Sequence, residues 1–399
     1  MLELSWKSAI EYFASFLTLY FSVFFLIIFL QNRGRLHENP RPPKSLPSLT
    51  LVIPAYNEGT TLAKSIESAL ACDYPRKELE IIVVDDGSRD ATLAIAKSYA
   101  SRGVRAVTKK NGGKASALNL ALKEAKGEFF ATLDADSYME KDGLRKMMGY
   151  FAEKDVGAVT SVMKVWRQET FWQKLQGVEY LVAVFTRRLQ SFMDAINVTP
   201  GPLSIFKTRV LRDLGGFDEG NLLEDQEMAL RLQEHHYRIK SSTNAIVYTD
   251  VPPGFFSLLR QRLRWYRGGM RNFISHYYMV SPRYGDFGVF FMPFAIVSIF
   301  VLFAVISFIV YSFATGFPLA AYFKYGWQAV VYSVTPLQLI SVAILAFVSL
   351  YTYLGLRFIE REFISVPVLL VYLIFYTPVI ILFWAVSFLQ ELLFVKLKW

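Results

Sequence analysis

Four long stretches of this sequence contain no Asp, Glu, Lys or Arg, and they constrain the fold more than any other feature. They lie at residues 12–30, 287–313, 327–356 and 363–390. Each has about the 20 or more residues that an α-helix needs to cross a bilayer. Charged residues make up only 19% of the chain and hydrophobic residues 53%, whereas soluble domains are about 25% charged. We therefore expect one N-terminal and three C-terminal transmembrane helices, and we exclude a soluble globule, a disordered chain and a disulfide scaffold.

The segment at residues 31–47 connects the first apolar stretch to the polar middle of the chain. It contains three arginines, one lysine and four prolines, a composition typical of a stiff linker. The positive-inside rule places these basic residues in the cytoplasm and Met1 outside. A hairpin near the end would return Trp399 to the cytoplasm, but residues 363–395 are too short for two crossings of roughly 20 residues each. We expect a multi-pass protein of the plasma membrane whose polar middle is cytoplasmic.

The single cysteine and the excess of basic residues indicate the cellular compartment and the kind of partner. Cys72 has no cysteine partner within the chain, which agrees with a reducing compartment. The 43 basic and 34 acidic residues give a net charge of +9, which favours contact with anionic lipid headgroups. The sequence has no dense basic run with interleaved aromatic residues, so we expect no nucleic-acid partner.

Residues 48–254 have the alternating pattern of an α/β domain. Apolar runs at residues 49–53, 79–84 and 129–133 have the length of strands, and each ends in a polar turn. Helical spacing of apolar residues follows the first turn. This alternation predicts a Rossmann-like, mostly parallel sheet with crossover helices. Because ligands of such sheets bind beyond the carboxyl ends of the strands, we expect the polar turns to form a site at that edge.

Two amphipathic stretches, residues 171–192 and 255–278, mix apolar and basic residues at helical spacing. Their basic residues are Lys174, Arg187, Arg188, Arg260, Arg262, Arg264, Arg267 and Arg271. We expect both stretches to lie in the membrane interface with these side chains at the headgroups. Packing of either helix against the domain surface is the alternative.

Five segments follow from these observations. They are an N-terminal transmembrane anchor at 1–30, a basic Pro-rich linker at 31–47, an α/β domain at 48–254, an amphipathic interface helix at 255–282 and a C-terminal transmembrane region at 283–399.

Two acidic pairs follow predicted strands and are candidates for metal and nucleotide binding. Asp134 and Asp136 follow the third apolar run, and hard divalent cations prefer carboxylate oxygens, so the pair predicts a cation that neutralises a departing diphosphate. Asp85 and Asp86 follow the second run and suit hydrogen bonds to a base or to ribose hydroxyls. The alternatives are an ordinary turn for the first pair and helix N-capping for the second.

Lys114 and a later acidic cluster are candidates for phosphate contact and for general-base catalysis. Lys114 stands at a predicted helix start, where it suits phosphate contact; a solvated lysine is the alternative. Glu224 and Asp225 open another helical pattern, where the helix dipole alone favours acids. A transferase also needs a carboxylate that deprotonates an acceptor hydroxyl, and we assign that role to Asp225.

Gln261, Arg264 and Trp265 are spaced to share one helix face. An indole ring stacks well on the apolar face of a sugar, and a guanidinium binds a diphosphate. This face is therefore a candidate surface for a sugar acceptor and a diphosphate.

The candidate residues fall within motifs whose order resembles that of the inverting glycosyltransferases of family 2. The motifs are Pro-x-Tyr-Asn-Glu at 54–58, Asp-Asp-Gly-Ser at 85–88, Gly-Gly-Lys-Ala-x-Ala-Leu-Asn at 112–119, Asp-x-Asp at 134–136, Glu-Asp at 224–225 and Gln-x-x-Arg-Trp at 261–265. The last motif, followed by membrane spans, is similar to the membrane-embedded branch of hyaluronan, chitin, cellulose and poly-N-acetylglucosamine synthases. One anchor before the domain and three spans after it most resemble the bacterial chito-oligosaccharide synthases.

The resemblance implies a GT-A nucleotide-sugar domain on the cytosolic face, and it assigns roles to individual residues. The nucleotide-sugar ligands would be Pro54, Tyr56, Glu58, Asp85, Asp86, Lys114 and Asp134. The ligands of Mg2+ or Mn2+ would be Asp136 and Asp134, and the catalytic carboxylates Asp225 and Glu224. The acceptor and diphosphate would be contacted by Gln261, Arg264, Trp265, Gly201 and Pro202.

The expected reaction is inverting, metal-dependent transfer of a sugar from a UDP-sugar to a hydroxyl acceptor at the membrane, with processive synthesis of a β-linked polysaccharide or oligosaccharide. The alternative is transfer of one sugar to a lipid, as in ceramide-type or polyprenyl-phosphate glycosyltransferases. A transporter or scaffold with a degenerate sugar-binding domain is a weaker alternative, because every acid of the motifs is present. The expected partners are the UDP-sugar, a growing glycan or lipid acceptor, and the bilayer.

Two features depart from the family pattern. Leu223 precedes the Glu-Asp motif, where many polymer synthases have Thr. The four expected spans are also fewer than those of the larger synthases. A homo-oligomer that completes a polymer channel is therefore left open.

Overall fold

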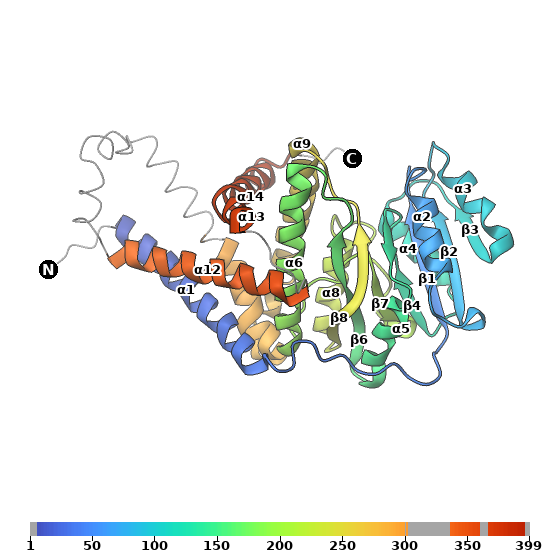
Figure 1. Ribbon diagram of the computed structural model, residues 1–399, viewed down its shortest axis with the longest axis horizontal. Helices are drawn as coiled ribbons and strands as arrows, with labels where there is room; N and C mark the ends of the chain where they lie inside the picture. The colour runs from blue at the N-terminus through green and yellow to red at the C-terminus, as the bar shows by residue number, and fades with distance from the viewer. Residues whose placement is uncertain (1–5, 300, 302–335, 360–365, 396–399) are drawn as a thin grey trace. The chain divides into compact units, whose positions relative to one another are not determined.

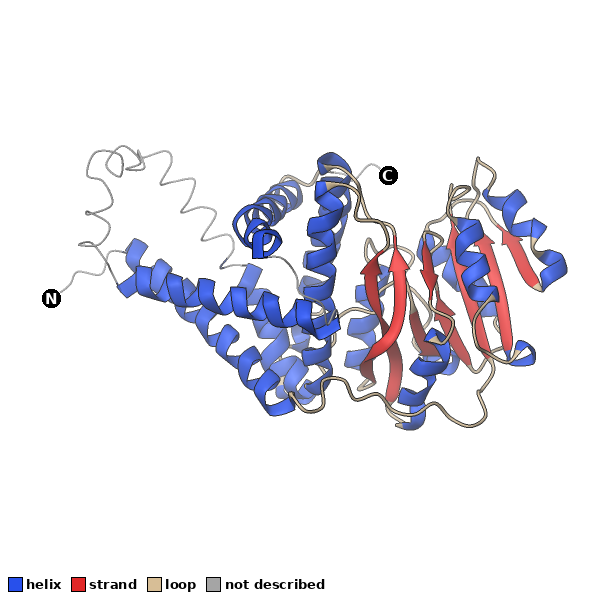
Figure 2. Cartoon of the chain, in the orientation of Figure 1, coloured by secondary structure: helices blue, strands red, loops and turns tan. Residues whose placement is uncertain are grey.

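The computed structural model describes residues 6–299, 301, 336–359 and 366–395. These residues form two compact units, each described by itself. One unit comprises residues 34–289 and contains the sheet drawn in red in Figure 2. The other comprises the described residues up to 33 and from 290 onward, and it is helical.

The unit of residues 34–289 is built on an eight-stranded sheet with the order β3-β2-β1-β4-β7-β6-β8-β5 (Figure 1). The strands are β1 (Leu49–Ala55), β2 (Leu79–Asp85), β3 (Val104–Thr108), β4 (Phe129–Thr132), β5 (Ser137–Met139), β6 (Val156–Val165), β7 (Ser204–Lys207) and β8 (Arg238–Thr249). Strands β3, β2, β1 and β4 are parallel, and β6 is parallel to β8. Strand β7 is antiparallel to β4 and β6, and β5 is antiparallel to β8.

The sheet is therefore mixed, but six of its eight strands run in the same direction, so the expected predominance of parallel strands holds. The two strands that run the opposite way, β5 and β7, were not predicted, because they are three and four residues long and too short to give a recognisable pattern. The three predicted strands are confirmed as β1, β2 and β4, side by side and parallel. Their carboxyl ends consequently meet at one edge of the sheet.

Helices pack on both faces of the sheet, and successive strand residues supply two hydrophobic cores. Along β1, Leu51 and Ile53 belong to one core and Val52 to the other, as the period of two requires. The first core includes α2 (Leu62–Leu70) and α5 (Gly143–Met148), and the second includes α4 (Lys114–Glu124), α7 (Thr208–Asp213) and α8 (Glu224–Glu234). Cover on both faces explains why the apolar runs are continuous.

Shorter elements complete the unit. They are α3 (Thr92–Ser98), the 3-10 turns η1 (Arg76–Glu78), η2 (Ala100–Arg102), η3 (Gly149–Ala152), η4 (Tyr277–Met279) and η5 (Pro282–Tyr284), and the π-helical turn η6 (Phe287–Phe291).

Residues 34–47, which we call the strap, are the greater part of the expected linker and are docked on this unit. Arg188 of α6 (Phe171–Phe192) holds the strap. Its guanidinium donates hydrogen bonds at 2.8–3.2 Å to the backbone oxygens of Arg35, Leu36, Glu38 and Ser241. Asn39 Oδ1 accepts a further bond from Tyr150 Oη at 2.7 Å. The strap is thus a bound part of the domain surface.

Both amphipathic stretches form helices, α6 and α9 (Phe255–Ser275), but several of their arginines lie inside the protein. The buried ones, each no more than 5% exposed, are Arg187, Arg188, Arg262 and Arg267. Their expected position at lipid headgroups is wrong, because α6 packs against β6 and β8 and the buried arginines of α9 face the protein. The exposed basic residues of the two helices are Lys174, Arg260 and Arg271.

The helical unit contains two helices that are long and apolar enough to cross a membrane. One is Tyr12–Asn32 within α1 (Trp6–Asn32). The other is Pro367–Leu392, which runs through α13 (Val366–Val371), the π-helical turn η7 (Tyr372–Tyr376) and α14 (Thr377–Leu392). They correspond to the first and last expected spans. The second is a continuous helix, so no hairpin forms within it.

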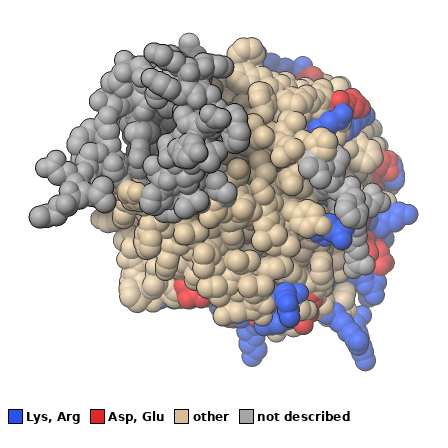
Figure 3. All heavy atoms as spheres, turned by 60° about the vertical axis from the view of Figure 1, so that its left-hand side comes forward, with Lys and Arg blue, Asp and Glu red and all other residues tan. Residues whose placement is uncertain are grey.

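The remaining two expected spans lie partly outside the described residues. Their described parts include the shorter apolar helices Phe287–Ile299 and Ala343–Phe358, the latter within α12 (Pro336–Ile359). The count of three C-terminal spans therefore stays a prediction. On the face drawn in Figure 3, a broad described area carries almost no Lys, Arg, Asp or Glu, as a lipid-facing surface requires.

The hydrogen bonds between Arg188 and the strap lead to a prediction about stability. Arg188→Ala leaves backbone oxygens of the strap and of β8 without their donor, and hydrogen bonds to a charged group contribute about 1.5–3 kcal/mol each. We expect a loss of about 3 kcal/mol or more in the free energy of unfolding, measured by denaturant titration of the purified protein. Arg209→Ala removes an arginine whose side chain is 91% exposed and should leave stability unchanged. Equal stability of the two variants would contradict the role assigned to Arg188.

Candidate active site

The loops that follow β1, β2 and β4 reach the same edge of the sheet, as the sequence predicted. They carry Glu58, Asp86 and Asp134, respectively. Burial raises the pKa of Glu58, and the negative charge of Asp134 raises it further, although a hydrogen bond from Thr61 opposes the shift. The acids of the β1 and β4 loops are therefore neighbours.

Lys114 is the cation around which these acids gather. It begins α4, and its Nζ forms an ion pair with Asp134 Oδ1 and lies 3.4 Å from Glu224 Oε1. Burial by itself lowers the pKa of Lys114, but the charges of Asp134, Glu224 and Asp225 outweigh burial and raise it above its ordinary value. Lys114 therefore stays charged and joins the β4 loop to the start of α8.

The backbone at Gly201 lies directly against this ion pair. A Cβ atom on Gly201 would lie 2.7 Å from Asp134 Oδ2 and closer still to Lys114 Nζ. The next turn is held by Ser204 Oγ, which donates to the backbone oxygen of Pro200 at 2.8 Å. The loop that contains Gly201 and Pro202 is thus placed at the site, where only glycine fits without displacing Lys114 or Asp134.

Asp136 and Asp134 form a pair of carboxylates whose negative charge Lys114 compensates only in part. Burial, followed by repulsion from Asp134 and Glu58, raises the pKa of Asp136 to about 7. Ser137 Oγ donates to Asp136 Oδ1 at 3.0 Å. The described residues include no group of three metal-ligating side chains, so a divalent cation here would take oxygens from this pair and from a ligand. The all-oxygen donor set and the excess negative charge fit Mg2+ or Mn2+.

Asp225 lies in the first turn of α8, next to Glu224. Its Oδ1 accepts a hydrogen bond from Gln226 N at 2.8 Å, and its backbone oxygen accepts from Thr199 Oγ1 at 2.8 Å. Burial and then the charge of Glu224 raise the pKa of Asp225 to about 7, against the opposing effect of Lys114. A carboxyl with such a pKa is suited to take a proton near neutral pH.

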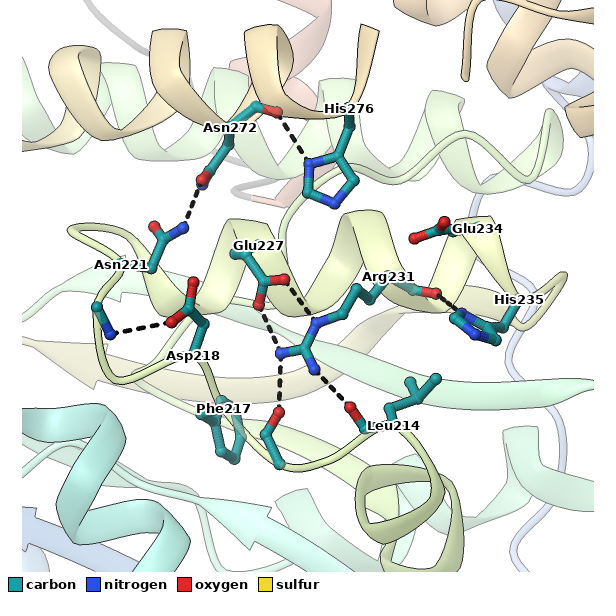
Figure 4. A network of polar contacts seen from close by, with 12 residues as sticks. Leu214, Phe217, Asp218, Asn221, Glu227, Arg231, Glu234, His235, Asn272 and His276 are labelled. Carbon is teal, nitrogen blue, oxygen red and sulfur yellow. Dashed lines mark hydrogen bonds and ion pairs between the residues drawn. The ribbon is translucent and has the colours of Figure 1, made fainter. Parts of the chain in front are cut away.

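A polar network fixes α8 in this position (Figure 4). Arg231 donates to Glu227 at 2.5 and 2.6 Å, to the backbone oxygen of Leu214 at 2.6 Å and to that of Gly216 at 2.8 Å. From α9, Asn272 Nδ2 donates to the backbone oxygen of Leu223 at 3.2 Å. The start of α8 is therefore held from both sides, which keeps its acids in place.

Asp85 and Asp86 are buried and bonded within the protein, with 1% and 3% exposure. Asp86 accepts from Lys109 Nζ at 2.7 Å and from Gly113 N at 2.7 Å, and Asp85 accepts from Thr108 Oγ1 at 2.8 Å. Asp86 thereby anchors the glycine loop that leads into Lys114. Their expected contacts with a nucleotide stay a prediction.

The remaining residues of the first motif lie along the same edge. Pro54 is the penultimate residue of β1, and Tyr56, just beyond the strand, is 45% exposed. Glu58 Oε2 accepts a hydrogen bond from Thr61 Oγ1 at 2.5 Å. Tyr56 is thus open to a ligand, whereas Glu58 is partly buried.

The Gln-x-x-Arg-Trp motif lies on α9, and its Trp265 packs against the first core. Its expected contact with an acceptor stays a prediction. The guanidinium of Arg262 lies 4.1 Å from the centre of the Trp265 ring, and its Nη1 donates to Gln261 Oε1 at 3.4 Å. Arg264 is half-buried on the same helix.

Sequence reasoning missed three charged or polar residues near the site. Arg262 pairs with Glu179 of α6 at 2.6 Å and supports Trp265, and Arg187 and Tyr180 lie on α6. The sequence does show that these residues recur at helical spacing with apolar ones, which predicts that they lie on amphipathic helices. A sequence alone does not distinguish a basic residue at a helix border from one inside the protein.

Comparison with known proteins shows what the sheet unit is similar to. Residues 50–215 match the model of glycosyl transferase family 2. The chain is 29% identical over 271 residues to a poly-beta-1,6-N-acetyl-D-glucosamine synthase of Staphylococcus aureus, covering 65% of each chain. It is 32% identical over 225 residues to the protein of that name from Staphylococcus epidermidis, covering 55% of this chain and 54% of the relative. The match thus spans less than two thirds of these relatives.

A solved structure shares the fold. A mannosyltransferase from Pyrobaculum calidifontis, in complex with GDP-Man and Mn2+, has a TM-score of 0.63 at 23% identity, covering 88% of this chain and all of that chain. The likeness agrees with a GT-A-like mixed sheet, and the family resemblance expected from the motifs is confirmed.

The raised pKa of Asp225 predicts a pH-dependent gain in stability for Asp225→Asn. An acid whose pKa is about 7 in the folded protein and about 4 when unfolded reduces stability progressively as pH rises between these values. The melting temperature of Asp225→Asn should therefore exceed that of the wild type at pH 8, and the difference should narrow towards pH 5. Asp213→Asn changes an exposed carboxylate and serves as the control. A difference independent of pH would contradict the assigned environment.

Proposed function

We propose that this chain, whose residues 50–215 form a glycosyl transferase family 2 domain, transfers a sugar from a UDP-sugar to a hydroxyl acceptor at a membrane, with inversion and repeated addition. The observation that carries the proposal is the convergence of Lys114, Asp134 and Glu224 at the carboxyl edge of the sheet, with Asp225 beside them. Such an arrangement supplies a base and a binding place for a diphosphate in one site.

The donor side of the proposed site is the edge formed by the β1, β2 and β4 loops. Tyr56 would contact the base, and Asp85 and Asp86 would bind the nucleoside directly or through the loop that Asp86 holds. Asp134 and Asp136 would hold Mg2+ or Mn2+, which when bound would neutralise charge on the departing UDP. The presence of Mn2+ in the solved mannosyltransferase supports a divalent cation.

Lys114 would change partners when the donor binds. In the free protein its charge is balanced by Asp134 and Glu224. A cation at Asp134 would weaken that ion pair, and the ammonium group at the start of α4 could then contact a phosphate oxygen. Arg264 of α9 would add a second positive charge for the diphosphate.

Asp225 would act as the catalytic base on the acceptor side. Its pKa of about 7 lets it accept the proton of the attacking hydroxyl near neutral pH. Attack on the anomeric carbon from the face opposite UDP would give inversion. Trp265 and the loop of Gly201 and Pro202 would hold the acceptor sugar against the base, through ring stacking and close backbone approach.

N-Acetylglucosamine is the first sugar to test, because the relatives from Staphylococcus are named for a polymer of it. The apolar helices Tyr12–Asn32 and Pro367–Leu392 would hold the enzyme in the plasma membrane with the sheet unit in the cytoplasm. A growing glycan could then cross the bilayer beside the site, through one copy or between two.

Release of UDP from a panel of UDP-sugars tests this proposal. Purified full-length protein in lipid nanodiscs would be incubated with each donor and with Mg2+, Mn2+ or EDTA, and the labelled product would be sized. We expect metal-dependent release of UDP, fastest with UDP-N-acetylglucosamine, and a ladder of products. A single glycolipid would instead favour one-step transfer to a lipid. No UDP release with any donor would reject the enzyme function.

Asp225→Asn tests the base. The substitution keeps the size of the side chain but removes the proton acceptor, so transfer should fall by a factor of about 100 or more while UDP binding, measured by calorimetry with Mg2+ or Mn2+, persists. Asp213→Asn should retain full turnover. Near-normal turnover of Asp225→Asn would show that another group is the base.

A further inference from the structure

Arg187 of α6 is buried without the partners that a buried arginine requires. It is 5% exposed, and its Nε and Nη1 atoms have no hydrogen-bond partner in the described part of the chain. Its neighbour Arg188 donates to four backbone oxygens, and Arg262 pairs with Glu179 at 2.6 Å. Arg187 therefore differs from Arg188, which is bonded to backbone oxygens, and from Arg262, which is paired with an acid.

An unpaired buried guanidinium is costly. Removing a charged group from water costs several kcal/mol unless hydrogen bonds or an opposite charge compensate. The cost is visible in the pKa of Arg187, which burial lowers to about 10 although Asp225 and Tyr180 oppose the shift. Apolar residues of similar size would fill the same space at lower cost. The arginine is therefore better explained by a ligand than by packing.

The surroundings of Arg187 place it beside the candidate site. Tyr180 precedes it by two helical turns and shares its face of α6. Burial raises the pKa of Tyr180, and the charges of Asp136 and Asp134 in the β4 loop raise it further, so Tyr180 lies near these two carboxylates. The face of α6 that carries Arg187 is therefore directed towards the site.

The chain that follows α6 brings the same region to α8. Gln233 Nε2 of α8 donates to the backbone oxygen of Ile196 at 3.0 Å, and Thr199 Oγ1 donates to that of Asp225 at 2.8 Å. The segment from Asp194 to Thr199 therefore runs along α8 up to its first turn. The charge of Asp225 in that turn also acts on Arg187, so Arg187 lies on the same side of the site as Asp225.

Arg187 and Asp225 interact electrostatically but are not in contact. Asp225 is the acid whose charge acts on Arg187, yet the ion pairs within 4.0 Å among the described residues do not include this pair. An oxygen atom of a ligand between them could accept from the guanidinium and donate its proton to the carboxylate. A sugar hydroxyl is the group that does both.

We propose that Arg187 is an acceptor-binding residue that donates hydrogen bonds from Nε and Nη1 to hydroxyl or acetamido oxygens of the acceptor sugar next to Asp225. The proposal rests on the function proposed above and adds a ligand contact that none of the motifs contains. The diphosphate is the less favoured ligand, because Lys114, Asp134 and Asp136 mark the donor side and the electrostatic partner of Arg187 is Asp225.

Binding and kinetics of full-length Arg187→Met in nanodiscs test this proposal. The probes are an N-acetylglucosamine tetrasaccharide, titrated in the presence of UDP and Mg2+, and UDP itself. We expect the Kd and the acceptor KM of the tetrasaccharide to rise about tenfold or more, the effect of losing one charge-assisted hydrogen bond, while the Kd of UDP stays within twofold. The melting temperature should equal or exceed that of the wild type, because an unpaired buried charge is removed.

Two variants serve as controls. Lys174→Met removes an exposed cation from the same helix and should change neither Kd nor turnover. Arg187→Lys keeps the charge but not the planar fork of donors, so its acceptor Kd should lie between those of the wild type and Arg187→Met. It also provides the test if Arg187→Met does not fold.

The outcomes separate this proposal from the one on which it rests. An unchanged acceptor Kd, a rise in the UDP Kd alone, or a lower melting temperature with proportional loss of all binding would overturn the role of Arg187. Failure of the wild type to bind the tetrasaccharide would overturn it as well. If the tetrasaccharide binds through Arg187 but no UDP is released from any donor, the binding role stands and the proposed transfer is rejected.

Discussion

The charge of Lys114 is the constraint on which the candidate site depends. Acids from the β1 loop, the β4 loop and α8 come together although they are far apart in the sequence, and their mutual repulsion opposes this arrangement. Contact of one ammonium group with Asp134 and Glu224 reduces that repulsion and ties two loops to the start of a helix. The pKa values of Asp136 and Asp225 are nevertheless about 7. Burial is the larger cause of both shifts and repulsion between the acids adds to it, so a bound cation would favour the ionised carboxylates.

The parallel half of the fold and the location of the site could be predicted from local pattern. The strands β1, β2 and β4 are continuous apolar runs because helices cover both faces of the sheet, and each ends in acids whose place at the carboxyl edge follows from parallel pairing. Lys114 and Asp134 were assigned to one ligand from their motifs, and they form an ion pair. The motif order also pointed to the family whose model matches residues 50–215.

The parts that could not be predicted depend on contacts between distant segments. Strands β5 and β7 take their direction from their neighbours in the sheet and are too short for a pattern of their own. The arginines of α6 and α9 have the spacing of an interfacial helix, but partners such as Glu179 and the backbone of the strap bring them inside. The metal contacts and the nucleotide contacts of Asp85 and Asp86 stay predictions for the same reason, since they depend on groups outside the chain.

Arg187 and Arg188 are adjacent on α6, but they differ in how strictly each one limits the chemistry of its partner. Arg188 recognises the strap through backbone oxygens, which every amino acid provides. Substitutions at Arg35 and Glu38, whose side chains are exposed, should therefore be tolerated as long as the path of the backbone is kept, whereas Asn39 is constrained by the bond from Tyr150. The partner of Arg187 cannot vary in this way, because the proposed ligand is a sugar with hydroxyl and acetamido groups at fixed positions. In one turn of helix, the first arginine restricts what the protein can bind, and the second leaves the exposed positions of the segment it holds free to change.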